Sequence, residues 1–580
     1  MSVRTSAYRH PTTSTANLPT KSGVRGRKGG ESVVPEQSFL SDIVAAEQQT
    51  PLPPPSGPGP PKQEAATAIE RRFAAVTAVI SRWLATNPDA MLQELLDQPA
   101  EQMPIFRRVV GPVMVMRQEH VLRCLERTDL FTVDPYAPEM ALATDDRDPT
   151  AYRHFLLGTD RDELYRLDDL ILRRVVTRDD EATVAALARA EAERRASPVG
   201  GEIDVAATVA KYVPLRIVGD YLGVPHQEIG EPSPLPSLCG GDPIPLDDDL
   251  ARRFSFTHIE KGRVPTAEDL YGWIKDAFRN IFNNPAGPLH DDFHKRGVIA
   301  NEYLTAYVHA LLRTARQRLD RGEAVPDTML TRLLRLQADS RAVECDAASL
   351  LDDPVPAGEI ARRLSDSMIR SNVVGTVVGA VVNPQEATAR IVDTMLRLQD
   401  GEYRTAGGAA FADVAGLALI DNGAPGYAEA LERLRRYALE ALRLRPQGEV
   451  LLRMCVQDTT ELGGVLVRKG TPVFVAYAAA MRDPQAVPEP LVFDVGRDER
   501  PTPYLADGDR AREAPQSRTY LQHGFGRHKC LGRYASEVTM RESLRALLRL
   551  GPWERRSPLR FDAQGLYAES LRVGVGGRSA

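Results

Sequence analysis

Cysteine is scarce in this chain, with five residues among 580. They are an odd number, lie far apart and include no C-x-x-C pair, namely Cys124, Cys239, Cys345, Cys455 and Cys530. This pattern excludes a disulfide framework and a structural zinc site, both of which need paired or clustered cysteines. We therefore expect reduced thiols and a cytoplasmic protein.

Long apolar runs and an excess of positive charge are also lacking. No stretch reaches the roughly eighteen consecutive apolar residues that cross a bilayer, and the N-terminus has no hydrophobic signal core. The formal net charge of −6 gives no general attraction to phosphate backbones. The sequence thus predicts a soluble protein with no membrane span and no nucleic-acid partner.

Residues 1–65 are rich in Ser, Thr, Pro and Gly and carry six basic residues before the first acid, Glu31. Such a segment does not bury enough apolar surface to offset the entropy lost on ordering. The composition predicts a disordered leader that ends in the proline-rich run 53–61, and a cleaved organelle-targeting peptide is the alternative. Residues 66–580 are expected to form one large domain.

From residue 66 onward the hydrophobic pattern is mostly helical. Apolar residues recur three and four positions apart over 69–96, 304–319, 329–336 and 428–444. Strand-like runs are few and short. One covers 109–116, and 462–475 indicates two strands joined through a turn at 468–470. We therefore expect a mainly α fold with small β-sheets.

The most informative stretch is HGFGRHKCLG, from His523 to Gly532, which leads directly into an amphipathic helix. Glycines before a helix let the backbone approach a flat cofactor. Cys530 stands where the loop becomes a helix, at the positive end of the helix dipole, which favours the iron-binding thiolate over the thiol. Free N–H groups at the helix start also point at the sulfur. The alternative is an ordinary buried thiol in a glycine-rich turn.

This loop resembles the haem-ligand signature of cytochromes P450, F-x-x-G-x-[HR]-x-C-x-G. The match is at Gly526, His528, Cys530 and Gly532, while His523 occupies the Phe position. The resemblance implies the cytochrome P450 fold and a haem b cofactor whose iron has Cys530 as its axial thiolate ligand. It also implies that Gly526 and Gly532 bring the loop and the following helix close to the ring.

Motifs upstream resemble the same family in order and spacing. Glu440 and Arg443 occupy the E-x-x-R positions, and an R-D-P segment at 482–484 and Arg497 follow. The resemblance implies that Glu440, Arg443 and Arg497 form a buried charge network that holds the cysteine loop in place. It also implies three haem-propionate ligands, Arg166, Arg453 and His528.

A valine-rich helix around residues 372–383 is expected on the distal side of the haem. Asn372, Gly375, Thr376, Gly379 and Asn383 lie three or four positions apart on one stripe. The resemblance places Gly379 against the ring and makes Thr376 and Asn372 the candidate catalytic residues. Monooxygenases of the family carry an acid followed by Thr here, which relays protons, and this sequence lacks that pair. Close helix packing is the alternative explanation of the stripe.

Three functions stay open at this point. A monooxygenase would insert one oxygen atom into an apolar or lipid-like substrate, and Arg527, Lys529 and Arg533 would either attract an acidic ferredoxin or reductase or form a merely solvated loop. A peroxygenase, or a fatty-acid hydroperoxide isomerase or dehydratase, would need no reductase and would use Asn372 to orient the peroxide. A haem-binding protein without turnover is the third function. We expect the monooxygenase, the commonest activity in the family.

Overall fold

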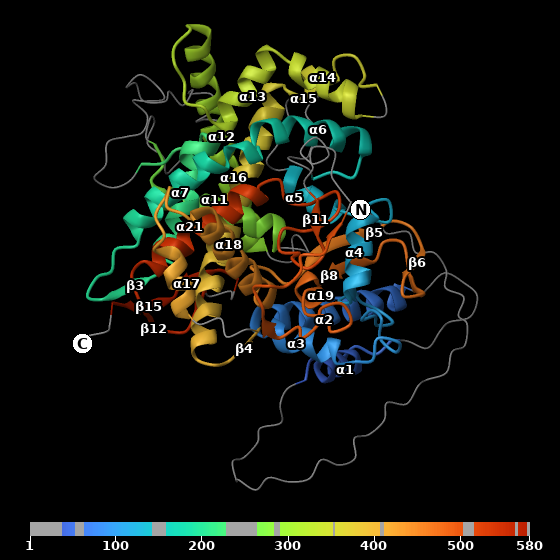
Figure 1. Cartoon of the computed structure of the whole chain (residues 1–580). Helices are drawn as coiled ribbons and strands as arrows, with labels where there is room; N and C mark the ends of the chain where they lie inside the picture. Colours follow the sequence, from blue (N-terminus) through green and yellow to red (C-terminus); the bar gives the residue numbers. More distant parts are fainter. Residues whose placement is uncertain are drawn as a thin grey trace.

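The computed structural model describes residues 38–52, 63–141, 158–227, 264–283, 291–351, 354–406, 411–502, 515–562 and 566–576. Helices dominate these residues and the strands are short (Figure 1), which confirms the predicted mainly α fold with small sheets. Cys239 lies outside the described residues.

The helices are α1 (Phe39–Gln49), α2 (Gln63–Thr86), α3 (Pro88–Leu96), α4 (Gln118–Glu126), α5 (Ala137–Ala141), α6 (Asp162–Val175), α7 (Glu181–Arg195), α8 (Val209–Ile217), α11 (Ala267–Phe282), α12 (Asp291–Asp320), α13 (Met329–Ala338), α14 (Arg341–Leu350), α15 (Glu359–Arg363), α16 (Asp366–Gln399), α17 (Phe411–Ala418), α18 (Tyr427–Leu444), α19 (Tyr477–Ala480) and α21 (Arg533–Leu548). Short helical turns are η1 (Asp134–Tyr136), η2 (Arg178–Asp180) and η3 (Val218–Leu222). The strands are β1 (Val113–Val115), β2 (Phe131–Thr132), β3 (Glu202–Asp204), β4 (Arg404–Thr405), β5 (Leu451–Cys455), β6 (Thr459–Leu462), β7 (Val465–Val467), β8 (Pro472–Val475), β9 (Val492–Phe493), β10 (Pro501–Thr502), β11 (Gln516–Ser517), β12 (Trp553–Arg555), β13 (Arg560–Phe561), β14 (Ala568–Ser570) and β15 (Arg572–Val575).

Helix α16 is the centre of the fold. Helices α8, α11, α12, α18 and α21 all pack against it (Figure 1). Its six valines between residues 373 and 382 are all buried. Valine is a weak helix former, but the burial of these side chains outweighs that small intrinsic cost. The helix continues through Pro384 to residue 399, so one rigid element carries the whole stripe predicted for the distal side.

Most of the predicted helices are observed, as parts of α12, α13 and α18. The pattern at 69–96 covers two helices, α2 and α3. They separate at Asn87 because Pro88, which lacks an N–H donor, occupies the first turn of α3. Among the described residues, no helix is long and apolar enough to span a membrane.

The largest sheet has the strand order β1-β8-β5-β2, with β1 parallel and β5 antiparallel to β8. The two strands predicted within 462–475 are observed as β7 and β8, joined through residues 468–471. They do not pair with each other, because β7 pairs with β6 while β8 joins the large sheet. Gly463 and Gly464 have φ of +63° and +73°, so the tight turn lies between β6 and β7. The hairpin of this region is therefore formed by β6 and β7.

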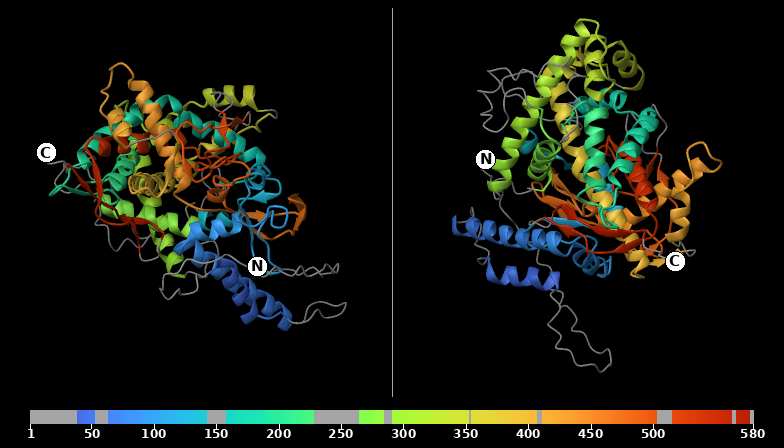
Figure 2. Two further views of the ribbon diagram at one scale, coloured as in Figure 1. Left: turned by 60° about the horizontal axis from the view of Figure 1, so that its bottom comes forward. Right: turned by 90° about the vertical axis from the view of Figure 1, so that its left-hand side faces the viewer.

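A folded helix lies inside the segment predicted as a leader. Phe39 and Ile43 of α1 are fully buried, and the Phe39 ring packs 5.4 Å from the Phe106 ring and 6.0 Å from the Trp83 ring. The Ser38 hydroxyl donates to Glu94 of α3 at 2.5 Å. Figure 2 shows α1 alongside α2. The predicted boundary at residue 65 therefore does not apply to residues 38–52, whose few apolar side chains suffice for docking.

Candidate functional site

The cysteine loop, residues 518–532, connects β11 to α21. The Cys530 N–H donates to the His523 carbonyl at 2.8 Å. The side-chain amide of Gln516 bonds the Gly526 backbone in both directions, at 2.9 and 3.1 Å. Gly526 has φ +74°, and a Cβ there would lie 2.3 Å from the Leu125 carbonyl oxygen of α4. Only glycine fits at this position, which gives the motif residue a packing reason.

The sulfur of Cys530 lies just before the first residue of α21. Its side chain is exposed, yet burial raises the pKa of the thiol. A side chain can be accessible and still be surrounded by protein when it lines a space within the protein. A hydrogen bond from the Gly532 backbone and the positive charges of Arg533, Arg173 and Lys529 oppose that rise in the pKa. An accessible sulfur that accepts a backbone hydrogen bond and lies near three cations fits a thiolate bound to a metal.

His528, a predicted propionate ligand, is held by α6 and the turn before it. Its Nε2 lies 2.6 Å from Oδ1 of Asp160, and its ring packs edge-on to Tyr165 with centroids 5.3 Å apart. The Tyr165 hydroxyl donates to the Arg527 carbonyl. These contacts set the orientation of the imidazole and dock the loop on α6. Its contact with a propionate stays a prediction.

Arg453 and Arg166 are the other predicted propionate ligands. Arg453 on β5 is 4% exposed and donates from Nη1 to the Leu452 carbonyl at 2.9 Å. Its Nε is buried and has no hydrogen-bond partner within the described parts of the chain. An unpaired buried donor is costly, so a carboxylate of a bound group suits this position. Arg166 lies half-buried on α6.

The distal stripe on α16 borders open space inside the molecule. Thr376, Gly379, Ala380 and Asn383 are half-buried, whereas the valines between them are buried. A Cβ added at Gly379 would find no atom within 4 Å. Asn372 is 2% exposed, and its carbonyl accepts a 2.8 Å hydrogen bond from the Thr376 hydroxyl. Of the two asparagines, Asn383 is the half-buried one, and its side-chain amide donates to the Gly379 carbonyl at 3.4 Å.

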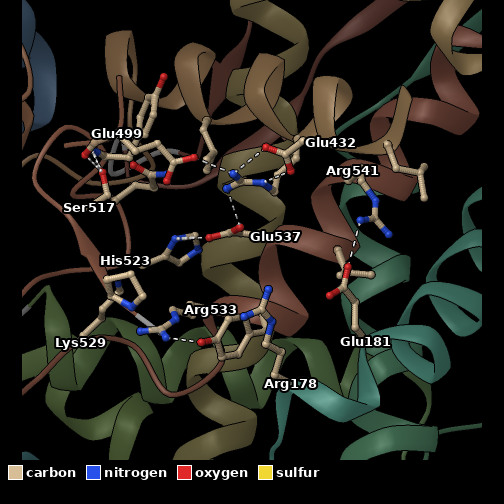
Figure 3. Close-up of a pocket in the computed structure, with 18 of the residues that line it drawn as sticks. Arg178, Glu181, Glu432, Glu499, Ser517, His523, Lys529, Arg533, Glu537 and Arg541 are labelled. Atoms are coloured by element: carbon tan, nitrogen blue, oxygen red, sulfur yellow. Dashed lines mark hydrogen bonds and ion pairs between the residues drawn. The ribbon is translucent and has the colours of Figure 1, made fainter. Parts of the chain in front are cut away.

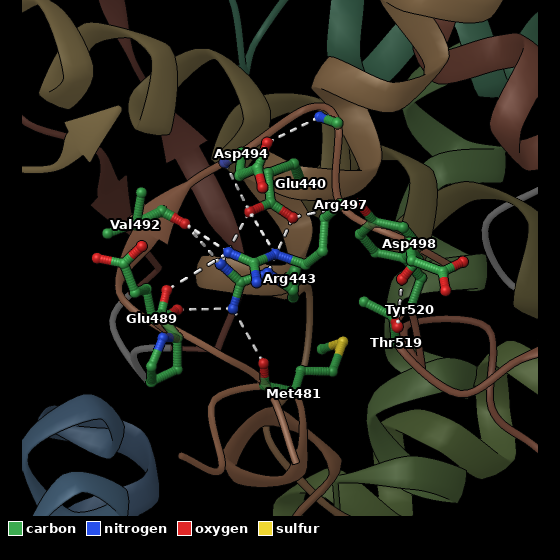
Figure 4. Close-up of polar contacts among 12 residues, drawn as sticks. Glu440, Arg443, Met481, Glu489, Val492, Asp494, Arg497, Asp498, Thr519 and Tyr520 are labelled. Atoms are coloured by element: carbon green, nitrogen blue, oxygen red, sulfur yellow. Dashed lines mark hydrogen bonds and ion pairs between the residues drawn. The ribbon is translucent and has the colours of Figure 1, made fainter. Parts of the chain in front are cut away.

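The predicted network around Glu440 is confirmed (Figure 4). Glu440 and Arg443 are fully buried and share two hydrogen bonds of 2.9 Å. Arg497 lies 3.3 Å from the same carboxylate. The Arg443 guanidinium also donates to the carbonyls of Met481 and Val492. A buried charge pair with its remaining donors satisfied specifies one arrangement of the three segments it joins.

The network extends to the cysteine loop. The Tyr520 hydroxyl donates to Glu440 at 3.3 Å, and the Thr519 hydroxyl donates to the Asp498 carbonyl at 2.7 Å. The residue after Tyr520 also makes a contact: the Leu521 N–H lies 3.2 Å from the Met481 sulfur. The predicted role of the network in holding the loop therefore has a direct structural basis.

The three basic residues expected on an open docking face lie differently. Arg527 is half-buried and stacks over the Tyr165 ring at 5.1 Å. Lys529 and Arg533 are 7% and 4% exposed and line a recess of about 420 Å³ (Figure 3). His523 lines the same recess, and burial, with nearby cations, lowers its pKa to about 3. Its imidazole is therefore neutral near pH 7.

Several residues of the site were not predicted. Asp160, Tyr165 and Gln516 position the cysteine loop through single long-range contacts. Isolated polar residues at such positions have no periodic signal. Asn383 was on the predicted stripe but was not predicted to be a catalytic residue.

Comparisons with known proteins agree with this geometry. The profile of the family described as Cytochrome P450 matches residues 429–557. "Cytochrome P450 6k1" of Blattella germanica is 33% identical over 123 residues, 21% of this chain and 22% of that protein. "Cyclooctat-9-en-7-ol 5-monooxygenase" of Streptomyces melanosporofaciens is 36% identical over 102 residues, 18% of this chain and 20% of that protein. The matches thus span about a fifth of these curated relatives.

Solved structures resemble nearly the whole chain. The open cytochrome P450 Eryk from S. erythraea covers 86% of this chain and 99% of its own, with a TM-score of 0.55 and 19% identity. Cytochrome P450 CYP109Q5 from Chondromyces apiculatus covers 86% and 97%, with a TM-score of 0.54 and 15% identity. At this identity the similarity establishes the fold.

Proposed function

Because this chain belongs to the cytochrome P450 family, we propose that it is a monooxygenase that inserts one oxygen atom into an apolar or lipid-like substrate with electrons from an external donor. The family's cofactor is haem, with iron bound by a cysteine thiolate. The observation that carries the proposal is Cys530, an accessible sulfur at the start of α21, in a loop tied to the buried Glu440 network.

The residues that would hold the haem come from three parts of the chain, namely the cysteine loop, β5 and α6. Cys530 would bind the iron, and the positions of Gly526 and Gly532 let the loop run close to the ring. Arg453, His528 and Arg166 would bind the propionates, of which Arg453 has the buried Nε donor described above. Bound in this way, haem supplies the redox chemistry for activating dioxygen.

The stripe on α16 would shape the opposite side of the cofactor. Gly379 leaves room for a flat group, and neighbouring valines keep the surroundings apolar. Such walls exclude water and favour an apolar substrate. The Thr376 hydroxyl is the proton-bearing group on the stripe, and its bond to the Asn372 carbonyl holds it in one rotamer. Proton delivery would pass through Thr376 or through water bound to it.

A hydroperoxide-using enzyme is the second candidate, and one observation favours it. The four half-buried residues of the stripe include no carboxylate, so the protons needed to cleave dioxygen have no acidic donor among them. A substrate that already contains an O–O bond needs no such donor. In that case Asn383, rather than Asn372, is the amide placed to orient the peroxide.

The haem-thiolate assignment is tested by the carbon monoxide difference spectrum of the reduced protein. We expect the red-shifted Soret band of a thiolate-ligated haem, and Cys530→Ser should abolish it. Cys345→Ser, at an exposed cysteine on α14, is the matched control and should keep the band. Haem-loaded wild type without that band would refute the axial ligand.

The oxidant is tested by comparing two assays on the holoprotein. The first supplies NAD(P)H with a surrogate ferredoxin and reductase, and the second supplies a fatty-acid hydroperoxide without reductant. The monooxygenase should turn over only in the first. Rapid reductant-free consumption, slowed at least tenfold by Asn383→Leu, would replace the proposal with the second candidate.

A further inference from the structure

Two residues other than glycine have a left-handed backbone among the residues that the structure describes. They are Glu489, with φ +43°, and Arg500, with φ +46°. Left-handed φ values are unfavourable for residues with a Cβ, and Arg500 also precedes Pro501, which favours an extended conformation of the residue before it. Such a conformation persists where surrounding contacts hold it, and it indicates a functional constraint.

The guanidinium group of Arg500 is bound by three separate segments of the chain. Its Nε donates to the Thr519 hydroxyl at 3.2 Å, and its Nη2 donates to Oε1 of Gln118 at 2.7 Å. Its Nη1 donates to the Ala486 carbonyl at 3.0 Å. Thr519 and Gln118 are both buried. Arg500 therefore connects the start of the cysteine loop to α4 and to the segment that follows α19.

The position of this guanidinium group is electrostatically unfavourable. Burial and the positive charges of Arg518 and Arg497 lower the pKa of Arg500, although Asp498 acts in the opposite direction. Like charges repel, so a third cation at this place costs stability. A strained backbone and a repelled side chain both act against folding. Stability by itself therefore does not explain why an arginine stands here.

Helix α4 is joined to the cysteine loop at both of its ends. At its first residue, Gln118 accepts from Arg500, which also donates to Thr519 of the loop. Near its last residue, the Leu125 carbonyl oxygen lies where it would meet a Cβ added at Gly526, 2.3 Å away. Arg500 thus fixes the start of the loop on α4, and the close contact at Gly526 fixes the part near the cysteine.

We propose that Arg500 is a positioning residue for Cys530. Its guanidinium group, directed by the left-handed backbone, holds the cysteine loop on α4 so that the sulfur stays in place to bind the haem iron. This inference rests on the proposed haem-thiolate function and extends it to a residue outside the loop. Arg500 acts indirectly, through Thr519 and Gln118.

Arg500→Gly separates ligation of the haem from folding. We expect the urea unfolding midpoint of the holoprotein to stay at the wild-type value or to rise, because relief of strain and of charge repulsion offsets the lost hydrogen bonds. The reduced carbon monoxide complex should nevertheless lose its red-shifted Soret band about tenfold faster at a fixed elevated temperature, the effect of one hydrogen bond to a charged group. A residue that only stabilised the fold would change both quantities together.

Two variants are matched controls. Arg518→Gln removes an exposed cation next to Thr519, and Glu489→Gly relieves a similar left-handed strain at an exposed residue. Both should lose the band at the wild-type rate. Arg500→Lys keeps the charge but lacks the planar fork that reaches three acceptors, so its rate should fall between those of wild type and Arg500→Gly.

The possible failures are distinguishable. A wild-type rate of band loss in Arg500→Gly would overturn the inference, and so would a faster rate accompanied by a lower unfolding midpoint. Wild-type holoprotein that lacks the red-shifted band from the start would instead refute the proposed haem-thiolate function.

Discussion

Single residues at the cysteine loop act through close packing as much as through chemistry. Gly526 illustrates this, because its positive φ and its contact with the Leu125 carbonyl both exclude a Cβ. The loop backbone that carries Cys530 is therefore closely packed at Gly526. We therefore expect a small change at Gly526 to disturb Cys530, the proposed metal ligand, four residues away.

We expect Gly526→Ala to destabilise the protein by about 2–4 kcal/mol, since backbone strain and a steric clash add together. The measurements are urea unfolding and the haem absorbance per mole of protein. Gly464→Ala is the matched control, because Gly464 has nearly the same φ, +73°, and a Cβ added there would meet no atom within 4 Å. It should show only the strain, about 1 kcal/mol. Equal losses in both variants would refute the role of the Leu125 contact.

Glu440→Gln should cost about 3–5 kcal/mol, because it leaves the buried Arg443 without its counter-charge. Urea unfolding measures the loss, and the haem content should fall with it. Glu432→Gln removes an exposed carboxylate from the same helix and should cost less than about 1 kcal/mol. A loss below about 1 kcal/mol at Glu440 would show that the network does not stabilise the fold.

At the scale of elements, the buried carboxylate of Asp393 joins α16 to two of its neighbours. Asp393 lies 2.6 Å from Arg555 of β12 and 3.1 Å from Arg445, which follows α18. Burial acts to raise the pKa of Asp393, but the guanidinium groups of Arg445, Arg555 and Arg397 hold it below its usual value. One side chain thus ties the C-terminal half of the central helix to two other elements.

The lowered pKa gives a pH dependence with a definite sign. A carboxyl whose pKa is lower in the folded state stabilises the protein above its unfolded pKa, near 3.8, and loses that effect as the pH falls through the folded value. Asp393→Asn should therefore cost about 3 kcal/mol at pH 7, and the difference from wild type should shrink below pH 4. Urea unfolding at a series of pH values measures both. A difference that is constant with pH would contradict the ionic role of Asp393.

At the scale of the whole molecule, the N-terminal helix is part of the core. Phe39 of α1 is fully buried against Trp83 and Phe106, which belong to segments far along the chain. The small sheets likewise join distant segments, as where β1 pairs with β8. The fold around α16 therefore extends to residue 38.

Phe39→Ala should cost about 3–5 kcal/mol, because it removes a buried aromatic ring and leaves a cavity. Val44→Ala on the same helix, at a side chain that is 39% exposed, should cost less than about 1 kcal/mol. Thermal unfolding of the holoproteins compares the two. Equal small effects would mean that α1 contributes nothing to the stability of the rest of the molecule.

The local pattern of the sequence determined the helical class, the cysteine at the start of α21 and the charged residues around Glu440, because periodicity and motif spacing report on local chemistry. Only the tertiary structure decided that β7 pairs with β6, that Lys529 and Arg533 face a recess, and that Asn383 is half-buried while Asn372 is buried. The helix α1 was outside the prediction because composition averages over a segment. Burial and strand pairing depend on contacts between residues far apart in the chain, and no local pattern records which distant side chain fills a given space.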